Sequence, residues 1–292
     1  MEKPAILHLI TPAKNASPFD VNMAIDAGFT HLMTYTNVSL NEVQGLTQDA
    51  IFSRSPSGVK REALFFGGRD INLSMDMLST AKNTMFNPFQ CSVMADPSGA
   101  FTTAAAMIAK VELFAKSLVG KKIAIFGCTG PVGGVAAIIA AKCGAEVTMV
   151  SHHSMLETTK IAEGYVEKYG VQLKVVDGST KLLKAEILHA SNIALCCAAA
   201  GVQVLSLSQI QAAQLQIIAD VNAVQPTGAE GVDVMADGVI IEDTQTLGIG
   251  ALAIGQLKYA TQHNLLKRLL SEQNQVFDFM SAYAEARLLS QA

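Results

Sequence analysis

The stretch Lys122-Ile-Ala-Ile-Phe-Gly-Cys-Thr-Gly-Pro-Val-Gly133 decides the fold of this chain. Its first five residues form an apolar run typical of a buried strand, and an alanine-rich helical segment follows from Val132 to Cys143. In the turn between them, Gly127 permits a tight bend, Gly130 lets a diphosphate approach the backbone, and Gly133 lets helix pack on strand. A helix amino terminus adds N–H groups and a positive dipole. The stretch therefore predicts a dinucleotide-binding turn of the Rossmann type.

The rest of this turn should also contact the cofactor, through Thr129, Pro131 and Val132. Proline suits the first helical position, because its missing N–H has no partner to lose there. A second strand from Glu146 to Val150 follows the helix, as a dinucleotide-binding unit requires.

Cofactor choice should be read after that second strand, at Ser151, His152 and His153. No acidic residue stands there to bind the ribose hydroxyls of NAD, and no lysine or arginine to bind the 2′-phosphate of NADP. The loop therefore leaves NAD, NADP or both open, and two solvated histidines are an equal reading. We expect no metal site, because adjacent histidines in a strand point to opposite faces and no carboxylate accompanies them.

Strand and helix patterns alternate on both sides of the turn, which predicts an α/β protein of two lobes. Residues 1–105 with a C-terminal helix at 262–292 should form an α/β substrate domain, and residues 106–261 a parallel-sheet Rossmann domain. The expected strands of the first lobe are Ala5–Ile10, Thr30–Tyr35 and Glu62–Phe66, and its expected helices are Pro18–Ala27, Leu40–Leu46 and Ile71–Asn83. The second lobe should follow a connector helix at Phe101–Leu118, with a helix at Met155–Tyr169, strands at Gln172–Val176, Ile193–Ala198, Ile217–Val221 and Val239–Glu242, and a helical tail at Ile254–Leu289.

Bulk composition excludes several classes of protein. The net charge is -4 and the basic residues are scattered among 292 residues, which argues against a nucleic-acid partner. No apolar run reaches the roughly 18 residues of a membrane helix, so no membrane association is expected. Five cysteines without C-x-x-C spacing fit reduced thiols and a cytoplasmic location. Half of the residues are hydrophobic and only 16% are charged, which favours a homo-oligomer.

Five polar residues outside the turn are candidates for a substrate site. They are Asp20, Asp96, Thr102, Thr103 and Lys258. Each also has a structural reading, because an aspartate or threonine can cap a helix or begin a turn and a lysine can extend along the surface. The residues alone leave both readings open.

Several separated blocks carry a resemblance to a known family. They are Ser17–Gly28, Thr47–Arg54, Ala95–Ala106, Asp220–Ala223 and Gly248–Gly255. In these blocks the chain resembles the bacterial methylenetetrahydromethanopterin dehydrogenases, and most closely the NAD(P)-dependent type of methylotrophs.

The resemblance implies that the chain oxidises the methylene bridge of tetrahydromethanopterin to a methenyl cation, in the route that carries formaldehyde carbon to carbon dioxide. It also implies catalytic roles for Asp20 and Lys258, substrate contacts for Asp96, Thr102 and Thr103, a cofactor contact for Asn222, and a homotrimer. The strictly NADP-dependent type carries a basic pair where this chain has Ser151-His152-His153, which favours NAD here, alone or with NADP.

Three other functions are compatible with the motifs. A methylenetetrahydrofolate dehydrogenase would share the turn and differ in its carrier. A shikimate-type dehydrogenase would need a lysine–aspartate pair for alcohol oxidation. A non-catalytic nicotinamide sensor would need a partner-binding module, and the chain has no basic segment to serve as one for DNA.

Overall fold

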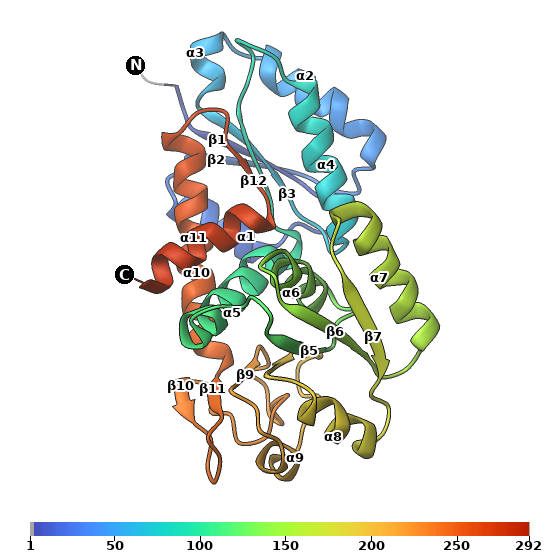
Figure 1. Cartoon of the computed structure of the whole chain (residues 1–292). Helices are drawn as coiled ribbons and strands as arrows, with labels where there is room; N and C mark the ends of the chain where they lie inside the picture. The colour runs from blue at the N-terminus through green and yellow to red at the C-terminus, as the bar shows by residue number, and fades with distance from the viewer. Residues whose placement is uncertain (1–2, 292) are drawn as a thin grey trace. The chain divides into compact units, whose positions relative to one another are not determined.

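The computed structural model describes residues 3–291, which divide into two α/β units (Figure 1). The first unit runs to Thr102 and includes Tyr259–Glu285, and the second comprises Thr103–Lys258 with the residues from Ala286 onward. The expected boundaries at residues 105 and 261 fall inside the two helices that join the units, α5 (Ala100–Ala115) and α10 (Ala251–Ser271).

The end of the last helix lies in a different unit from the one we expected. Helix α11 (Phe279–Gln291) begins in the first unit, but the residues from Ala286 belong to the second. One physical reason is an ion pair, in which Arg287 Nε lies 2.6 Å from Glu112 Oε2 on α5.

The first unit is built on a five-stranded parallel sheet in the order β12-β4-β3-β1-β2. Its strands are β1 (Ile6–Ile10), β2 (His31–Tyr35), β3 (Glu62–Phe66), β4 (Ser92–Ala95) and β12 (Val276–Phe277). Its helices are α1 (Pro18–Asp26), α2 (Val43–Phe52), α3 (Pro56–Val59) and α4 (Ile71–Thr84), with 3-10 turns at Leu40–Glu42 and Pro97–Gly99.

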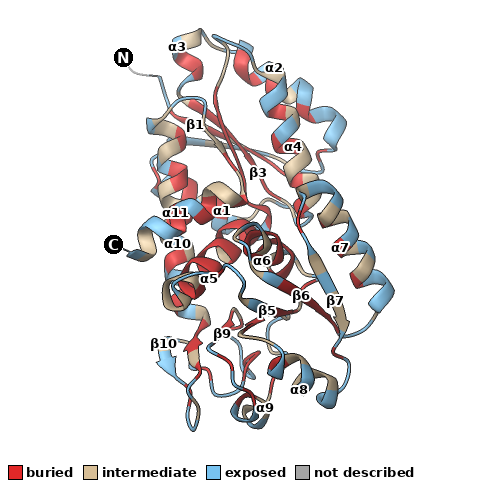
Figure 2. Cartoon of the chain, in the orientation of Figure 1, coloured by how far each residue is buried: buried red, intermediate tan, exposed pale blue. Residues whose placement is uncertain are grey.

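The apolar runs of the sequence form the centre of this sheet. Every residue of β3 is buried, and Figure 2 shows the buried colour along β1 and β3. Ser17 caps α1 by accepting a hydrogen bond from the Asp20 amide, and Asp70 caps α4 in the same way. The tail expected to be helical at Ile254–Leu289 consists mostly of α10 and α11, but β12 lies between these two helices and pairs with β4. A two-residue strand carries no periodic pattern that could announce it.

The second unit contains a seven-stranded sheet in the order β10-β11-β9-β8-β5-β6-β7. The strands are β5 (Lys122–Phe126), β6 (Glu146–Ser151), β7 (Leu173–Asp177), β8 (Ile193–Cys196), β9 (Ile217–Asp220), β10 (Asp237–Ile240) and β11 (Leu247–Ile249). Its own helices are α6 (Pro131–Lys142), α7 (Met155–Tyr169), α8 (Lys181–His189) and α9 (Leu207–Ala212). From β7 to β11 the order is that of a doubly wound Rossmann sheet, with the topological switch between β5 and β8.

Two expectations for this unit are wrong. The segment expected as a buried parallel strand at Val239–Glu242 is β10, which is antiparallel to β11, and Val239 and Ile240 are each 58% exposed. Its position at the sheet edge leaves it one neighbour and little cover. The connector helix α5 ends at Ala115 and not at Leu118, because Lys116 takes a left-handed conformation with φ of 65°.

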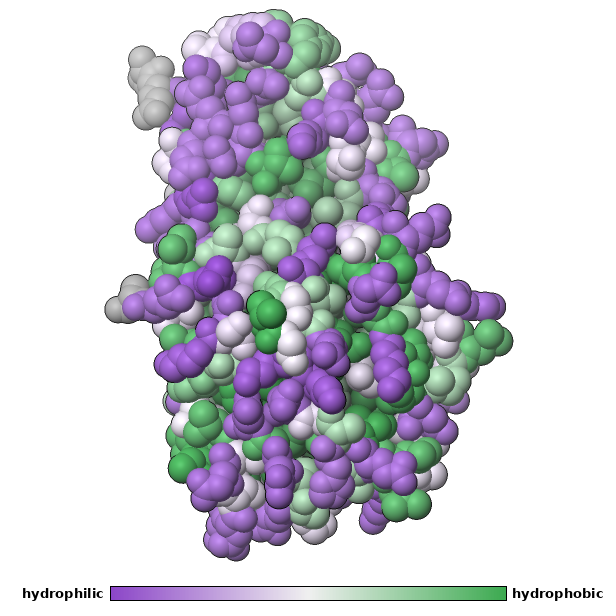
Figure 3. All heavy atoms as spheres, in the orientation of Figure 1, coloured by the Kyte–Doolittle hydropathy of each residue, from purple (hydrophilic) through white to green (hydrophobic). Residues whose placement is uncertain are grey.

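On the face drawn in Figure 3, hydrophobic residues are interspersed with hydrophilic ones. Within residues 3–291, no helix combines the length and the apolar character that crossing a bilayer demands.

Candidate active site

The glycine turn follows β5 at the switch point of the second unit's sheet. Gly127 has φ of 75°, and a Cβ there would lie 2.5 Å from the backbone carbon of Cys197. At Gly133, a Cβ would lie 2.5 Å from the Gly127 carbonyl oxygen. At Gly130 the nearest atom to an added Cβ is the same oxygen, at 3.4 Å. The first two glycines are required by the protein's own packing, whereas Gly130 borders open space.

Helix α6 begins at this turn without a side-chain cap. Its N-cap residue is Gly130, and Pro131 occupies the first helical position. A twelve-residue helix directs a positive dipole and the N–H groups of its first turn at this point. These features fit a bound diphosphate, because the helix terminus presents backbone donors and Gly130 has no Cβ that would hinder the approach of the ligand.

A cavity of about 440 Å³ opens beside the turn. Its wall includes Gly127, Cys128 and Thr129 of the turn and all of the loop from Ser151 to Ser154. Further lining residues are Phe126, Val150, Glu157, Thr158, Gly178, Lys184, Ala198, Ala199, Val202, Gln203 and Val204. The cavity thus unites Gly127, Thr129, Ser151, His152 and His153 of the predicted cofactor residues. Gly130, Pro131, Val132 and Gly133 lie at the start of α6, outside its lining.

The loop after β6 is organised by hydroxyl groups. The Thr158 hydroxyl lies 3.0 Å from both the Ser151 hydroxyl and the Ser154 carbonyl, and Ser154 caps α7. The rings of His152 and His153 stand side by side, with centroids 4.4 Å apart. Our expectation that they point to opposite faces is wrong, because both follow the last residue of β6. No group of His, Cys, Asp and Glu suited to a metal ion occurs in the described part of the chain.

Asn222 lies buried in the loop after β9 and is not part of the cavity wall. Its Oδ1 accepts from the amides of Gly201 and Val224, and its Nδ2 donates to the Pro226 carbonyl. The neighbouring Asp220 accepts from the Asn222 and Ala229 amides at 2.9 Å each. Burial raises the pKa of the Asp220 carboxyl, while these hydrogen bonds oppose the rise. This carboxyl and amide organise the loops that follow β8 and β9.

Of the thiols near the turn, those of Cys128 and Cys196 are buried and that of Cys197 is half-buried. Cys128 is 1% exposed, and burial raises its pKa to about 11. Burial also raises the pKa of Cys196 and of Cys197. None of the chain's five cysteines, all within the described residues, forms a disulfide. The thiols therefore contribute packing around the turn.

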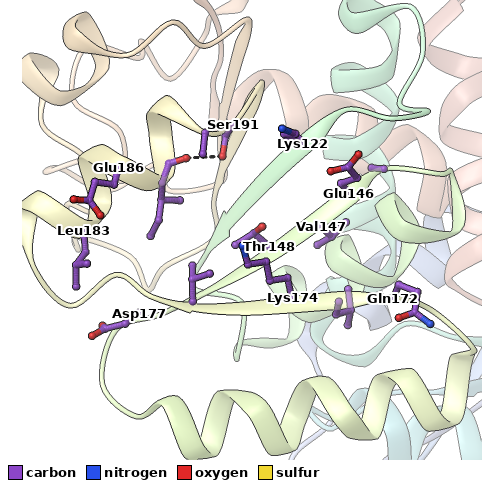
Figure 4. A pocket seen from close by; sticks show the side chains of 15 residues that line it. Lys122, Glu146, Val147, Thr148, Gln172, Lys174, Asp177, Leu183, Glu186 and Ser191 are labelled. Atoms are coloured by element: carbon purple, nitrogen blue, oxygen red, sulfur yellow. Dashed lines mark hydrogen bonds between the residues drawn. The ribbon is translucent and has the colours of Figure 1, made fainter.

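A larger cavity of about 780 Å³ in the same unit does not carry the site. Figure 4 shows Lys122, Glu146 and Lys174 projecting from the strands, with Leu183 and Glu186 on α8. Lys122 and Glu146 are the first residues of β5 and β6, so much of the lining lies at the amino ends of the strands. Ligands of open α/β sheets bind at the carboxyl ends, where the glycine turn is.

In the first unit, Asp20 lies on α1 and is 4% exposed. Its Oδ1 accepts a hydrogen bond of 2.9 Å from Gln262 Nε2 on α10, and Gln262 is itself fully buried. Gln262 was missed from the sequence, because a glutamine in a helical tail gives no local signal. The hydrogen bond from Gln262 therefore fixes the orientation of the buried Asp20 carboxyl.

Asp96 and Thr102 contact each other at the start of α5. Asp96 Oδ2 accepts from the Thr102 hydroxyl at 2.6 Å, and Oδ1 accepts from the amides of Phe101 and Thr102. Neither residue is exposed. The Asp96 carboxyl therefore caps the amino terminus of α5, a role that we expected of the threonines.

Thr103 and Lys258 belong to the second unit, where each is partly buried. Thr103 lies on α5, and Lys258 lies on α10 at the last position before the chain returns to the first unit.

A second polar cluster of the first unit was not foreseen. Arg54 Nε lies 2.7 Å from Glu62 Oε1, and Glu62 Oε2 lies 3.4 Å from His8 Nε2. The other ring nitrogen of His8 lies 3.1 Å from the Tyr35 hydroxyl. Burial, and next the charge of Glu62, raise the pKa of Tyr35. Alternate positions on three parallel strands bring these side chains to one face, which the sequence cannot show without the strand order.

Solved structures support the fold. The chain is similar to the ligand-free 5-ketofructose reductase of a Gluconobacter species, with a TM-score of 0.56, 12% identity, and coverage of 98% of this chain and 99% of that one. At that identity the likeness extends to the architecture alone.

Sequence comparisons identify the family. Residues 18–98 match the family described as methylene-tetrahydromethanopterin dehydrogenase, N-terminal. The chain is 42% identical over 286 residues, and 96% of both chains, to the NAD(P)-dependent methylenetetrahydromethanopterin dehydrogenase of Methylorubrum extorquens. It is 29% identical to the bifunctional protein MdtA of that organism, over 98% of this chain and 99% of the other. The chain therefore belongs to the methylenetetrahydromethanopterin dehydrogenase family.

Proposed function

We propose that the protein transfers a hydride from methylenetetrahydromethanopterin to NAD or NADP, giving the methenyl form of the carrier. The observation that carries this proposal is the 42% identity to an enzyme of that name over 96% of both chains. The glycine turn supports it independently, because its geometry fits a dinucleotide diphosphate.

Hydride transfer from this carrier makes specific demands on the protein. The reacting carbon lies between two nitrogens, so loss of a hydride gives a delocalised amidinium cation and no proton has to be removed. A bound nicotinamide would supply the hydride acceptor. The protein needs to hold the two rings at about 3 to 3.5 Å between reacting atoms and to place negative charge near the growing cation.

We propose that Asp20 supplies this charge and that Gln262 fixes its orientation through their hydrogen bond. Lys258 and Thr103 remain proposed contacts to the carrier. Asp96 and Thr102 are better suited to positioning, because they bond to each other and to the first amides of α5. Asn222 is likewise a proposed positioning residue of the loop after β9.

The experiment that tests the function is an assay of the purified protein with four pairs of substrates. Methylenetetrahydromethanopterin and methylenetetrahydrofolate are each combined with NAD or NADP, and reduced nicotinamide is followed by its absorbance. We expect turnover with the methanopterin carrier and either nicotinamide. Turnover with the folate carrier only, or with neither, would refute the proposal.

We also propose that the enzyme is a cytoplasmic homo-oligomer, a trimer if the resemblance to the family extends to assembly. Large apolar residues exposed at the edge of the second unit, Met235, Val239 and Ile240, support a covering partner. Light scattering should give a mass well above the 30.8 kDa of one chain, and a mass equal to one chain would contradict the proposal.

A further inference from the structure

The cavity beside the glycine turn contains a lysine that the motif does not account for. Lys184 is the one lysine or arginine among its described lining residues. It lies in the first turn of α8, and its Nζ donates a 2.8 Å hydrogen bond to the Val204 carbonyl in the loop after β8. A lysine ammonium has three donors, so two of them remain available to a ligand.

The position of Lys184 differs from that of a residue that binds the adenosine ribose. A dinucleotide ribose is recognised where the second strand of the unit ends, which here is Ser151 at the end of β6. Lys184 instead bonds to the loop after β8, and β8 and β6 lie on opposite sides of β5. The ammonium is thus tied to a different part of the cavity wall.

The wall around this part is mostly apolar, and Gln203 is the one polar residue that the loop after β8 adds to it. Ala198, Ala199 and Val202, all in the loop after β8, line the cavity together with Val204. Small aliphatic side chains suit the face of a flat aromatic ring, and an ammonium at the margin suits an acceptor on the ring edge. Burial lowers the pKa of Lys184, which agrees with its partly desolvated position.

We propose that Lys184 binds the adenine base of the dinucleotide, donating a hydrogen bond to a ring nitrogen while the alanines and Val202 pack on the ring face. This inference rests on the proposed function, since it requires a dinucleotide on the glycine turn. Adenine is common to NAD and NADP, and its ring nitrogens are acceptors. A contact to the base therefore gives affinity for both cofactors, although Ser151–Ser154 offers no carboxylate, lysine or arginine.

The test compares Lys184→Met with Lys181→Met, an exposed lysine of the same helix that does not line the cavity. The dissociation constants of NADH and NADPH are measured by fluorescence titration. Loss of a hydrogen bond from a charged donor should raise both constants by about tenfold in Lys184→Met, by equal factors, and leave both nearly unchanged in Lys181→Met. The kcat at saturating cofactor should be retained.

Other outcomes would overturn the inference in recognisable ways. A loss confined to NADPH would assign the ammonium to the 2′-phosphate. No loss for either cofactor would leave Lys184 as a tie between α8 and Val204 only. Failure of the unaltered protein to bind either dinucleotide would instead refute the proposed function.

A second measurement needs no variant. Lysines of the unaltered protein are acetylated, and modification at Lys184 is quantified by mass spectrometry with and without adenosine monophosphate. We expect this nucleotide and its 2′-phosphorylated analogue to protect Lys184 equally and to leave Lys181 unprotected. Absence of protection by the simple nucleotide would contradict a contact to the base.

Discussion

Two glycines of the turn differ in how much room they leave for a Cβ. At Gly133 a Cβ would lie 2.5 Å from a backbone oxygen, whereas at Gly130 the nearest atom is 3.4 Å away. We expect Gly133→Ala to lower the free energy of unfolding by about 1–3 kcal/mol through overpacking. Gly130→Ala should cost less than about 1 kcal/mol of stability yet weaken NADH binding, because its Cβ would stand where the diphosphate approaches. Urea denaturation and NADH titration measure both effects, and identical behaviour of the two variants would contradict these roles.

We propose that Asp20 supplies the negative charge near the cation that forms in the reaction. Replacing it with asparagine removes the charge and keeps the side-chain shape, and the variant's Oδ1 can still accept from Gln262. Loss of one preorganised electrostatic contact to a transition state typically costs about 10²–10³ in kcat. We expect a fall of this size in Asp20→Asn with NADH affinity unchanged. A kcat within a few-fold of the unaltered protein, in a folded variant, would remove Asp20 from the reaction.

At the scale of elements, strong local sequence patterns predicted helices and strands correctly, whereas the shortest strands were missed. The β5, α6 and β6 unit was predicted because an apolar run, three glycines and an alanine-rich helix agree with one another. The strands β11 and β12 were missed, because two or three residues are too few for a periodicity, and the four-residue β4 was missed as well. Of the predicted cofactor residues, Gly127, Thr129 and the loop after β6 line one cavity. Gln262 and Lys184 were not predicted, because their contacts depend on packing between segments apart in sequence.

Arg54 stabilises the first sheet by neutralising a carboxylate on β3. Glu62 is 2% exposed, and the nearby Lys60 is exposed and provides a control. Arg54→Met should lower the free energy of unfolding by about 3–5 kcal/mol, because it leaves the buried Glu62 charge without its partner. Lys60→Met should change it by less than about 0.5 kcal/mol. Equal stabilities of the two variants in urea would show that the ion pair contributes nothing.

The burial of the cysteines near the turn predicts the order in which their thiols react with an alkylating reagent. Burial raises the pKa of Cys128 to about 11 and removes the side chain from solvent, whereas Cys143 at the end of α6 is partly exposed. Iodoacetamide at neutral pH should therefore modify Cys143 well before Cys128 in the folded protein, and both at similar rates in urea. Mass spectrometry checks the order, and rapid native labelling of Cys128 would contradict its burial.

At the scale of the whole molecule, one fact could not be read from local patterns. The tail was expected to belong to the first lobe. Residues Tyr259–Glu285 do belong to the first unit, where β12 joins the sheet, but the residues from Ala286 belong to the second unit. Partition of a chain end depends on contacts such as that of Arg287 with Glu112, which are far apart in sequence. The resemblance to a family predicted the activity of the protein, but it gave no information on these contacts.

The most direct test of the account is the position of the dinucleotide in a crystal of the protein grown with NADP. We expect the diphosphate to lie on the amides at the start of α6 and the adenosine half to occupy the cavity bordered by Ser151 and Lys184. A diphosphate bound at any other place, with the glycine turn empty, would contradict it.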